Sequence, residues 1–101
     1  ENIRQLRDAR GVRAESVPTA SWDGAIMNNA IPPFNDMRVR QAFHLAVPKA
    51  DVVEAVLFGE GKPTISPIPP GHPFYAEDIR LPERADAAAA RRLLREAGHA
   101  G

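Results

Sequence analysis

The sequence predicts an α/β fold in which about four helices accompany a small, antiparallel two-stranded sheet. Three observations support this prediction. Apolar residues recur at the three- and four-residue spacing of a helix face in several separate stretches. Two short extended runs, one with β-branched residues, lie between the first and second of these stretches. Prolines and glycines stand between the segments, where they end regular structure.

The first part of the chain, residues 1–35, is expected to hold a short helix followed by two strands. Ile3 and Leu6 lie one helical turn apart, and a glycine follows them. The two extended runs after this glycine are joined by only a short turn, which favours antiparallel pairing. The expected boundaries are Gly11 for the helix end, Val12–Val17 and Trp22–Asn29 for the strands, and Pro18–Ser21 for the turn.

Residues 36–61 are predicted to form two consecutive helices. Pro32-Pro33 holds the chain extended, and Asp36 can accept a hydrogen bond from a free amide in the first helical turn. Pro48 breaks this helix, and because proline is tolerated in a first turn, a second helix can begin there or at Lys49. The first helix runs from Met37 to Val47 with Val39, Ala42, Phe43, Ala46 and Val47 on its apolar face; the second has Val52, Val53, Val56 and Leu57 and ends at Gly59 and Gly61.

The remaining residues are predicted to form an ordered proline-rich loop, residues 62–82, and a last helix, residues 83–98. The prolines of the loop make regular structure unexpected, and its apolar side chains favour packing over a free linker. Asp86 caps the last helix and Gly98 ends it. The apolar residues are Ile65, Ile68, Phe74, Tyr75, Ile79 and Leu81 in the loop and Ala90, Leu93, Leu94 and Ala97 in the helix.

The composition is that of an ordinary globular chain with no strong charge. Of its 101 residues, 44% are hydrophobic, and 13 basic residues balance 13 acidic ones. A zero net charge gives no electrostatic reason to expect nucleic acid or an anionic membrane as a partner. The sequence contains no cysteine, which excludes disulfides and thiolate chemistry. A chain of this length forms at most one domain.

No group of residues has the pattern of a catalytic or metal site. The histidines are far apart in the sequence and have no carboxylate or thiolate at ligand spacing, and the serines lack the context of a nucleophile. The best-placed carboxylates, Asp36 and Asp86, are explained as helix caps. We therefore expect no enzymatic activity, no metal and no cofactor. The residues compared with these patterns are His44, His72, His99, Ser16, Ser21 and Ser66.

The sequence around the Met37 helix resembles that of a known family. The string PPFNDMRVRQAFHLAV, residues 32–47, is similar to the helix-opening signature of the family 5 bacterial extracellular solute-binding proteins. These are the dipeptide-, oligopeptide- and nickel-binding receptors of ABC importers. Further matches follow in the same order at Gly59-Glu60-Gly61, at Ile68–Tyr75 and at Ala90–Gly98. One departure is Pro48, which stands where the family usually has aspartate.

The resemblance implies that residues 1–101 are a piece of the C-terminal lobe of a much longer, two-lobed receptor. The absence of an initiator methionine agrees with this expectation. The whole protein would be periplasmic or a cell-surface lipoprotein. It would bind a peptide or related small solute by lobe closure and deliver it to the ABC permease. The isolated piece is expected to expose apolar surface, which favours self-association.

The segment before Pro32 is where the resemblance implies ligand contact, because the corresponding strand runs along the cleft side of the lobe. Side chains alternate between the two faces of a strand. One face holds Gly24, Ile26 and Asn28, and the other holds Asp23, Ala25 and Met27. We predict that the first set binds substrate, since the Asn28 amide could bond to a peptide backbone. The alternative, that Asn28 and Asn29 serve the turn before the prolines, has equal weight.

Two other features admit both a functional and a structural interpretation. Arg38 and Arg40 could clamp a peptide carboxylate, or they could lie on the polar side of the helix and pair with nearby acids or solvent. We favour the structural role, because the family repeats this Arg-Val-Arg string in receptors for different ligands. Trp22 could line a pocket or fill the core, and we favour the core.

Two other classes of protein remain as alternatives. One is a free-standing helical interaction module, which would unfold cooperatively as a monomer without exposed apolar surface. The other is a small DNA-binding domain that uses the arginine-rich Met37 helix, against which the zero net charge argues.

Overall fold

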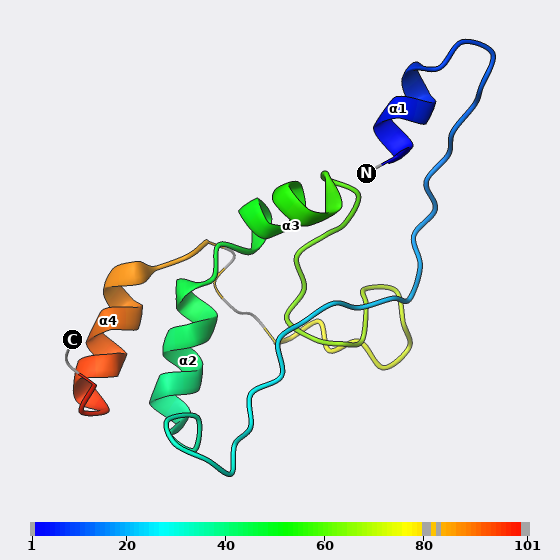
Figure 1. Ribbon diagram of the computed structural model, residues 1–101. Helices are drawn as coiled ribbons and strands as arrows, with labels where there is room; N and C mark the ends of the chain where they lie inside the picture. Colours follow the sequence, from blue (N-terminus) through cyan, green and yellow to red (C-terminus); the bar gives the residue numbers. More distant parts are fainter. Residues whose placement is uncertain (1, 80–81, 83, 100–101) are drawn as a thin grey trace.

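The computed structural model describes residues 2–79, 82 and 84–99, and in them it contains four α-helices (Figure 1). The predicted number of helices is confirmed. Leu81, predicted to pack, and the first residue of the predicted 83–98 helix lie outside the described residues. The helices are α1 (Asn2–Asp8), α2 (Met37–Ala46), α3 (Lys49–Leu57) and α4 (Ala87–Glu96).

The predicted two-stranded sheet is wrong for the described residues, which contain no strand. Residues 12–17 and 22–29 are extended, but they do not fold back on one another (Figure 1), and no ladder of backbone hydrogen bonds joins them. The physical reason is that an isolated two-stranded ribbon is at best weakly stable in water without a layer to cover it. No such layer is present here, because Val17 remains 73% exposed and Ile26 remains 88% exposed.

The start of α2 follows the predicted capping chemistry. Asp36 has extended backbone, and its side-chain oxygen accepts a hydrogen bond from the Arg38 amide at 2.8 Å. The helix ends at Ala46, and the Val47 amide still donates to the Phe43 carbonyl at 3.3 Å. Because Pro48 lacks an amide hydrogen and restricts the residue before it, the helix ends one residue earlier than predicted.

The next helix, α3, begins at Lys49 as predicted, directly after Pro48. It ends where Phe58 and Gly59 both have left-handed backbone, with φ of 53° and 80°. This conformation is strained for phenylalanine and easy for glycine, and it turns the chain sharply away from the helix axis. None of the residues of α3 is fully buried, so its predicted apolar stripe is covered only in part: Val53 is half-buried and Val56 is 64% exposed.

The tertiary core lies between α2 and α4, which pack side by side in antiparallel orientation (Figure 1). The Asp86 amide, before α4, donates to the Leu45 carbonyl near the end of α2 at 2.8 Å. At the opposite ends, Arg38 Nη1 donates to the Glu96 carbonyl at 2.5 Å. Asp86 also caps α4, accepting from the Ala89 amide at 2.8 Å. The buried apolar residues are Val39, Ala42 and Ala90.

The proline-rich loop has the irregular course that was predicted, with local turns in place of helix or strand. The His72 amide donates to the Pro69 carbonyl at 3.2 Å, and the Tyr75 amide donates to the His72 carbonyl at 2.9 Å. Its apolar side chains are only partly covered, since Phe74 is 79% exposed. Packing of the loop is therefore incomplete within the described residues.

The molecule as a whole is elongated and open. Its dimensions are 59 × 33 × 23 Å, and its radius of gyration is 17.4 Å. A compact chain of this length would have a radius of gyration of about 13 Å. None of the described helices combines the length and the apolar character that a membrane span requires.

Candidate functional site

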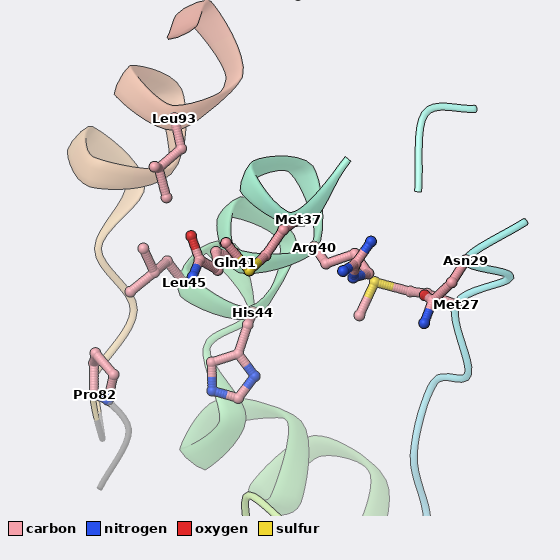
Figure 2. Close-up of a pocket in the computed structure, with 9 residues that line it drawn as sticks. All are labelled: Met27, Asn29, Met37, Arg40, Gln41, His44, Leu45, Pro82 and Leu93. Carbon is pink, nitrogen blue, oxygen red and sulfur yellow. The ribbon is translucent and has the colours of Figure 1, made fainter. Parts of the chain in front are cut away.

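The principal concave feature beside the helix pair is an open groove with a volume of about 640 Å³ (Figure 2). One wall is a single face of α2, because its lining residues recur every three or four positions. The extended segment supplies the facing wall, and α4 with the approach to it closes one end. The lining residues are Met27, Asn29, Met37, Arg40, Gln41, His44, Leu45, Pro82 and Leu93.

The groove is mainly apolar, and its arginine already has a protein partner. Figure 2 shows Met37 and Gln41 on the α2 wall, with Met27 across from them. Arg40 Nη1 donates to the Phe34 carbonyl at 2.7 Å, which holds the proline-containing turn against the start of α2. Arg40 thus has a structural contact, but its partner is a backbone carbonyl and not the nearby acid or solvent that the sequence led us to expect.

His44 is the polar group of the groove whose hydrogen bonding is incomplete. Its Nε2 atom is buried and has no hydrogen-bond partner in the part of the chain that the structure describes. Burial lowers the pKa of His44, and the nearby charge of Lys49 lowers it further. A buried polar atom without a hydrogen-bond partner is destabilising. The Nε2 atom of the neutral His44 ring can accept or donate one further hydrogen bond.

Arg38 is likewise occupied by the protein itself. Its guanidinium bonds to Asp36 at 3.1 Å through Nε and at 2.6 Å through Nη2, in addition to its contact with the Glu96 carbonyl. The side-chain hydrogen bond from Arg38, followed by that from its amide, lowers the pKa of Asp36 to about 2. Every named contact of Arg38 therefore joins parts of the fold.

The predicted substrate-binding residues Gly24, Ile26 and Asn28 do not line this groove. Ile26 is exposed to solvent, and the Asn28 side-chain oxygen accepts from the Ala30 amide at 3.0 Å, as the turn alternative predicts. Sequence reasoning instead missed Met27 and Asn29, which do line it. Alternation along a strand separates two faces but does not say which one meets the rest of the fold.

Trp22 occupies neither the core nor the groove. Its side chain is 39% exposed, and its ring lies against the backbone of Gly24. A Cβ atom added at Gly24 would lie within 2.2 Å of the indole ring, so any larger residue there would displace the tryptophan.

Metal chemistry finds no support in the described residues. Among residues 2–79, 82 and 84–99, no three histidine, cysteine or carboxylate side chains come close enough together to hold an ion.

Comparison with known proteins identifies the family, which the geometry of the groove alone does not. The profile of the family described as bacterial extracellular solute-binding proteins, family 5 Middle, matches residues 1–101, the full length of the chain. The chain belongs to this family. Family 5 proteins bind solutes and are not enzymes, which agrees with the absence of a catalytic pattern in the sequence.

Several curated relatives of this family 5 chain carry names that state a ligand. Di/tripeptide-binding protein 3 of Pseudomonas aeruginosa strain UCBPP-PA14 is 32% identical over 97 residues, which is 96% of this chain and 18% of that protein. The dipeptide-binding protein of P. aeruginosa strain PAO1 aligns with the same identity and coverage. Heme-binding protein A of Haemophilus influenzae is 38% identical over 72 residues, or 71% of this chain and 13% of that protein.

The family 5 chain spans under a fifth of the length of these first two relatives, at 18% of each. No solved structure shows a significant match to it.

Proposed function

We propose that this chain is part of the substrate-binding component of an ABC importer for peptides or a related small solute. The main support for this proposal is that 96% of the chain aligns with a di/tripeptide-binding protein. The mechanism is hinge closure of two lobes over the solute, followed by delivery to the permease, and it requires no catalytic group. The protein would act in the periplasm or, lipid-anchored, at the cell surface, as suits an extracellular solute-binding family.

Within that receptor, residues 1–101 would form a scaffold of the C-terminal lobe. The open shape of the chain supports this role, because it leaves extended segments and helix faces without cover. The exposed residues 12–17 and 22–29 would then become strands by pairing with backbone supplied by the rest of the protein. A sheet of three or more strands with a covered face is stable where an isolated pair is not.

Gly24, Ile26 and Asn28 remain our proposed ligand-contact residues in the complete receptor. Their support is exposure, since the structure leaves all three accessible. Asn28 offers an amide that can both donate to and accept from a peptide backbone, and Gly24 lets a backbone approach closely.

The test is a titration of the protein that carries residues 1–101 with di- and tripeptides, with heme titrated in parallel. Thermal unfolding and calorimetry should show a rise in the midpoint with peptide, because a ligand that binds the folded state stabilises it. Replacing the amide by Asn28→Ala should weaken peptide binding by about tenfold, as expected for a lost hydrogen bond to a buried partner. Asn35→Ala is the matched control, because this exposed asparagine lies outside the groove lining.

The two parts of the proposal can fail separately. If no peptide raises the midpoint and heme does, peptide is the wrong ligand class. If peptide binds and Asn35→Ala weakens binding as much as Asn28→Ala, the assignment of the contact residues is wrong.

A further inference from the structure

Arginine side chains make the polar contacts that attach α1 to α3, and the apolar residue Ile3 is only half-buried. None of the residues of α1 is buried, and the same is true of α3, to which it is attached. Arg4 Nη2 lies 2.7 Å from Glu54 Oε1, and Arg7 Nη1 lies 2.7 Å from Glu60 Oε1. Because long guanidinium side chains span the gap between these two helices, the attachment depends on charge.

The receiving surface is the C-terminal end of α3, which is suited to a cation. Arg4 Nη2 also donates to the Phe58 carbonyl at 3.0 Å, and the guanidinium carbon lies 5.8 Å from the centre of the Phe58 ring. Carbonyls at a helix C-terminus carry partial negative charge, and an aromatic face attracts a guanidinium. The left-handed turn at Phe58 and Gly59 brings Glu60 round to the same side.

Glu60 connects the end of α3 to α1 through Arg7. The side-chain hydrogen bond of Ser16, and then that of Arg7, hold the pKa of Glu60 below its ordinary value. Glu60 is therefore ionised near neutral pH, where its carboxylate accepts from the Arg7 guanidinium at 2.7 and 3.4 Å.

We propose that the contacts of Arg4 and Arg7 with Glu54, Phe58 and Glu60 form an ionic strap that salt releases. The strap fixes one end of the extended segment 12–31, whose other end is fixed at the start of α2 by the Arg40 contact with Phe34. Release of α1 would give this segment freedom to change its course. The strap itself does not depend on the proposed function, although the segment includes the residues proposed to meet ligand.

Such a strap is reversible because its parts are exposed. Arg4 and Glu54 side chains are 56% and 65% exposed. An exposed ion pair changes an equilibrium by only about twofold to fivefold, and salt screens it further. No residue of α1 is fully buried and Ile3 is only half-buried, so little apolar packing would hold the helix in place once the charges are screened.

The test measures the distance between α1 and α3 by energy transfer. The chain has no cysteine, so Gln5→Cys and Ala50→Cys place one dye on each helix. Raising NaCl from about 0.01 M to 1 M shortens the Debye length from about 30 Å to about 3 Å. We expect transfer efficiency to fall over this range in the native background. In the double variant Arg4→Ala/Arg7→Ala it should be low at every salt concentration.

A matched control removes the same charge outside the strap. Arg10→Ala/Arg13→Ala also deletes two cations close in sequence, and Arg13 pairs with Glu15 inside its own segment. This control should keep the high efficiency at low salt. Charge exchange gives a second check: Arg7→Glu should release α1, and adding Glu60→Arg should restore its attachment.

Three outcomes would overturn the proposal. The first is an energy-transfer efficiency that does not change with salt in the native background. The second is a loss of transfer efficiency in Arg10→Ala/Arg13→Ala equal to that in Arg4→Ala/Arg7→Ala. The third is loss of helical circular dichroism in step with the efficiency, which would mean melting of helices instead of release. Because the measurement uses no ligand, its failure would leave the proposed solute-binding function untouched.

Discussion

Asp36 combines two interactions at the start of α2. One oxygen accepts the Arg38 amide, and the carboxylate also holds the Arg38 guanidinium, which reaches on to the Glu96 carbonyl of α4. A single carboxylate thereby starts one helix and orients the side chain that joins it to another. These contacts give Asp36 and Arg38 a structural role without any need for a ligand.

The low pKa of Asp36 predicts an acid-sensitive helix start. Its folded value of about 2 lies below the ordinary 3.8, so the ionised carboxylate stabilises the folded state above about pH 4. That contribution is lost as the pH falls toward about 2. Asp36→Asn keeps a capping oxygen but has no charge. The variant should therefore lose less helical circular dichroism than the native chain between these pH values, and identical acid curves would contradict the argument.

At the scale of elements, the α2–α4 pair depends on small buried side chains. Ala42 is 1% exposed and Ala90 is 3% exposed, so each sits where the two helices meet. The pair has a hydrogen bond at each end, which fixes its antiparallel register. Close helix approach at alanine positions leaves little space for additional methylene groups.

We predict that Ala90→Leu separates the helices and destabilises the fold by about 1–3 kcal/mol, as overpacking does in a filled core. Ala88→Leu adds the same atoms to an exposed position of α4 and should change the free energy of unfolding by no more than about 0.5 kcal/mol. Urea unfolding followed by circular dichroism measures both. Equal effects would show that the space beside Ala90 is not filled.

These elements also show which features a sequence can predict. Asp36, Pro48 and Asp86 act through neighbours within a few residues. The boundaries at Asp36 and Pro48 were predicted to within one residue, and Asp86 caps α4 as predicted, although α4 spans Ala87–Glu96 and not the expected 83–98. The sheet could not be predicted in the same way, because strand pairing depends on neighbouring strands and packing that the local sequence does not specify. The groove lining could not be predicted for a related reason. Whether Met27 or Ile26 faces the groove depends on which other parts of the fold lie on each side of the extended segment.

At the scale of the whole molecule, the exposed area is too large for a self-contained domain. The surface area is 8267 Å², whereas a compact protein of 11.0 kDa would expose about 5,600 Å². The excess, about 2,600 Å², is similar to the area that stable protein interfaces bury. The groove face of α2 contributes to this excess through Met37, which is 60% exposed. A free-standing helical module would not retain such a surface.

The isolated chain should therefore self-associate through its uncovered surface, and the groove face should contribute. We expect sedimentation velocity to show mass increasing with concentration, because apolar area is removed from water on contact and zero net charge offers no repulsion. Met37→Glu should weaken association, since it places a carboxylate on the groove wall. Ala88→Glu is the control, because it puts the same carboxylate in the first turn of α4, outside the groove lining. A strictly monomeric chain with a radius of gyration near 13 Å would instead indicate the helical module.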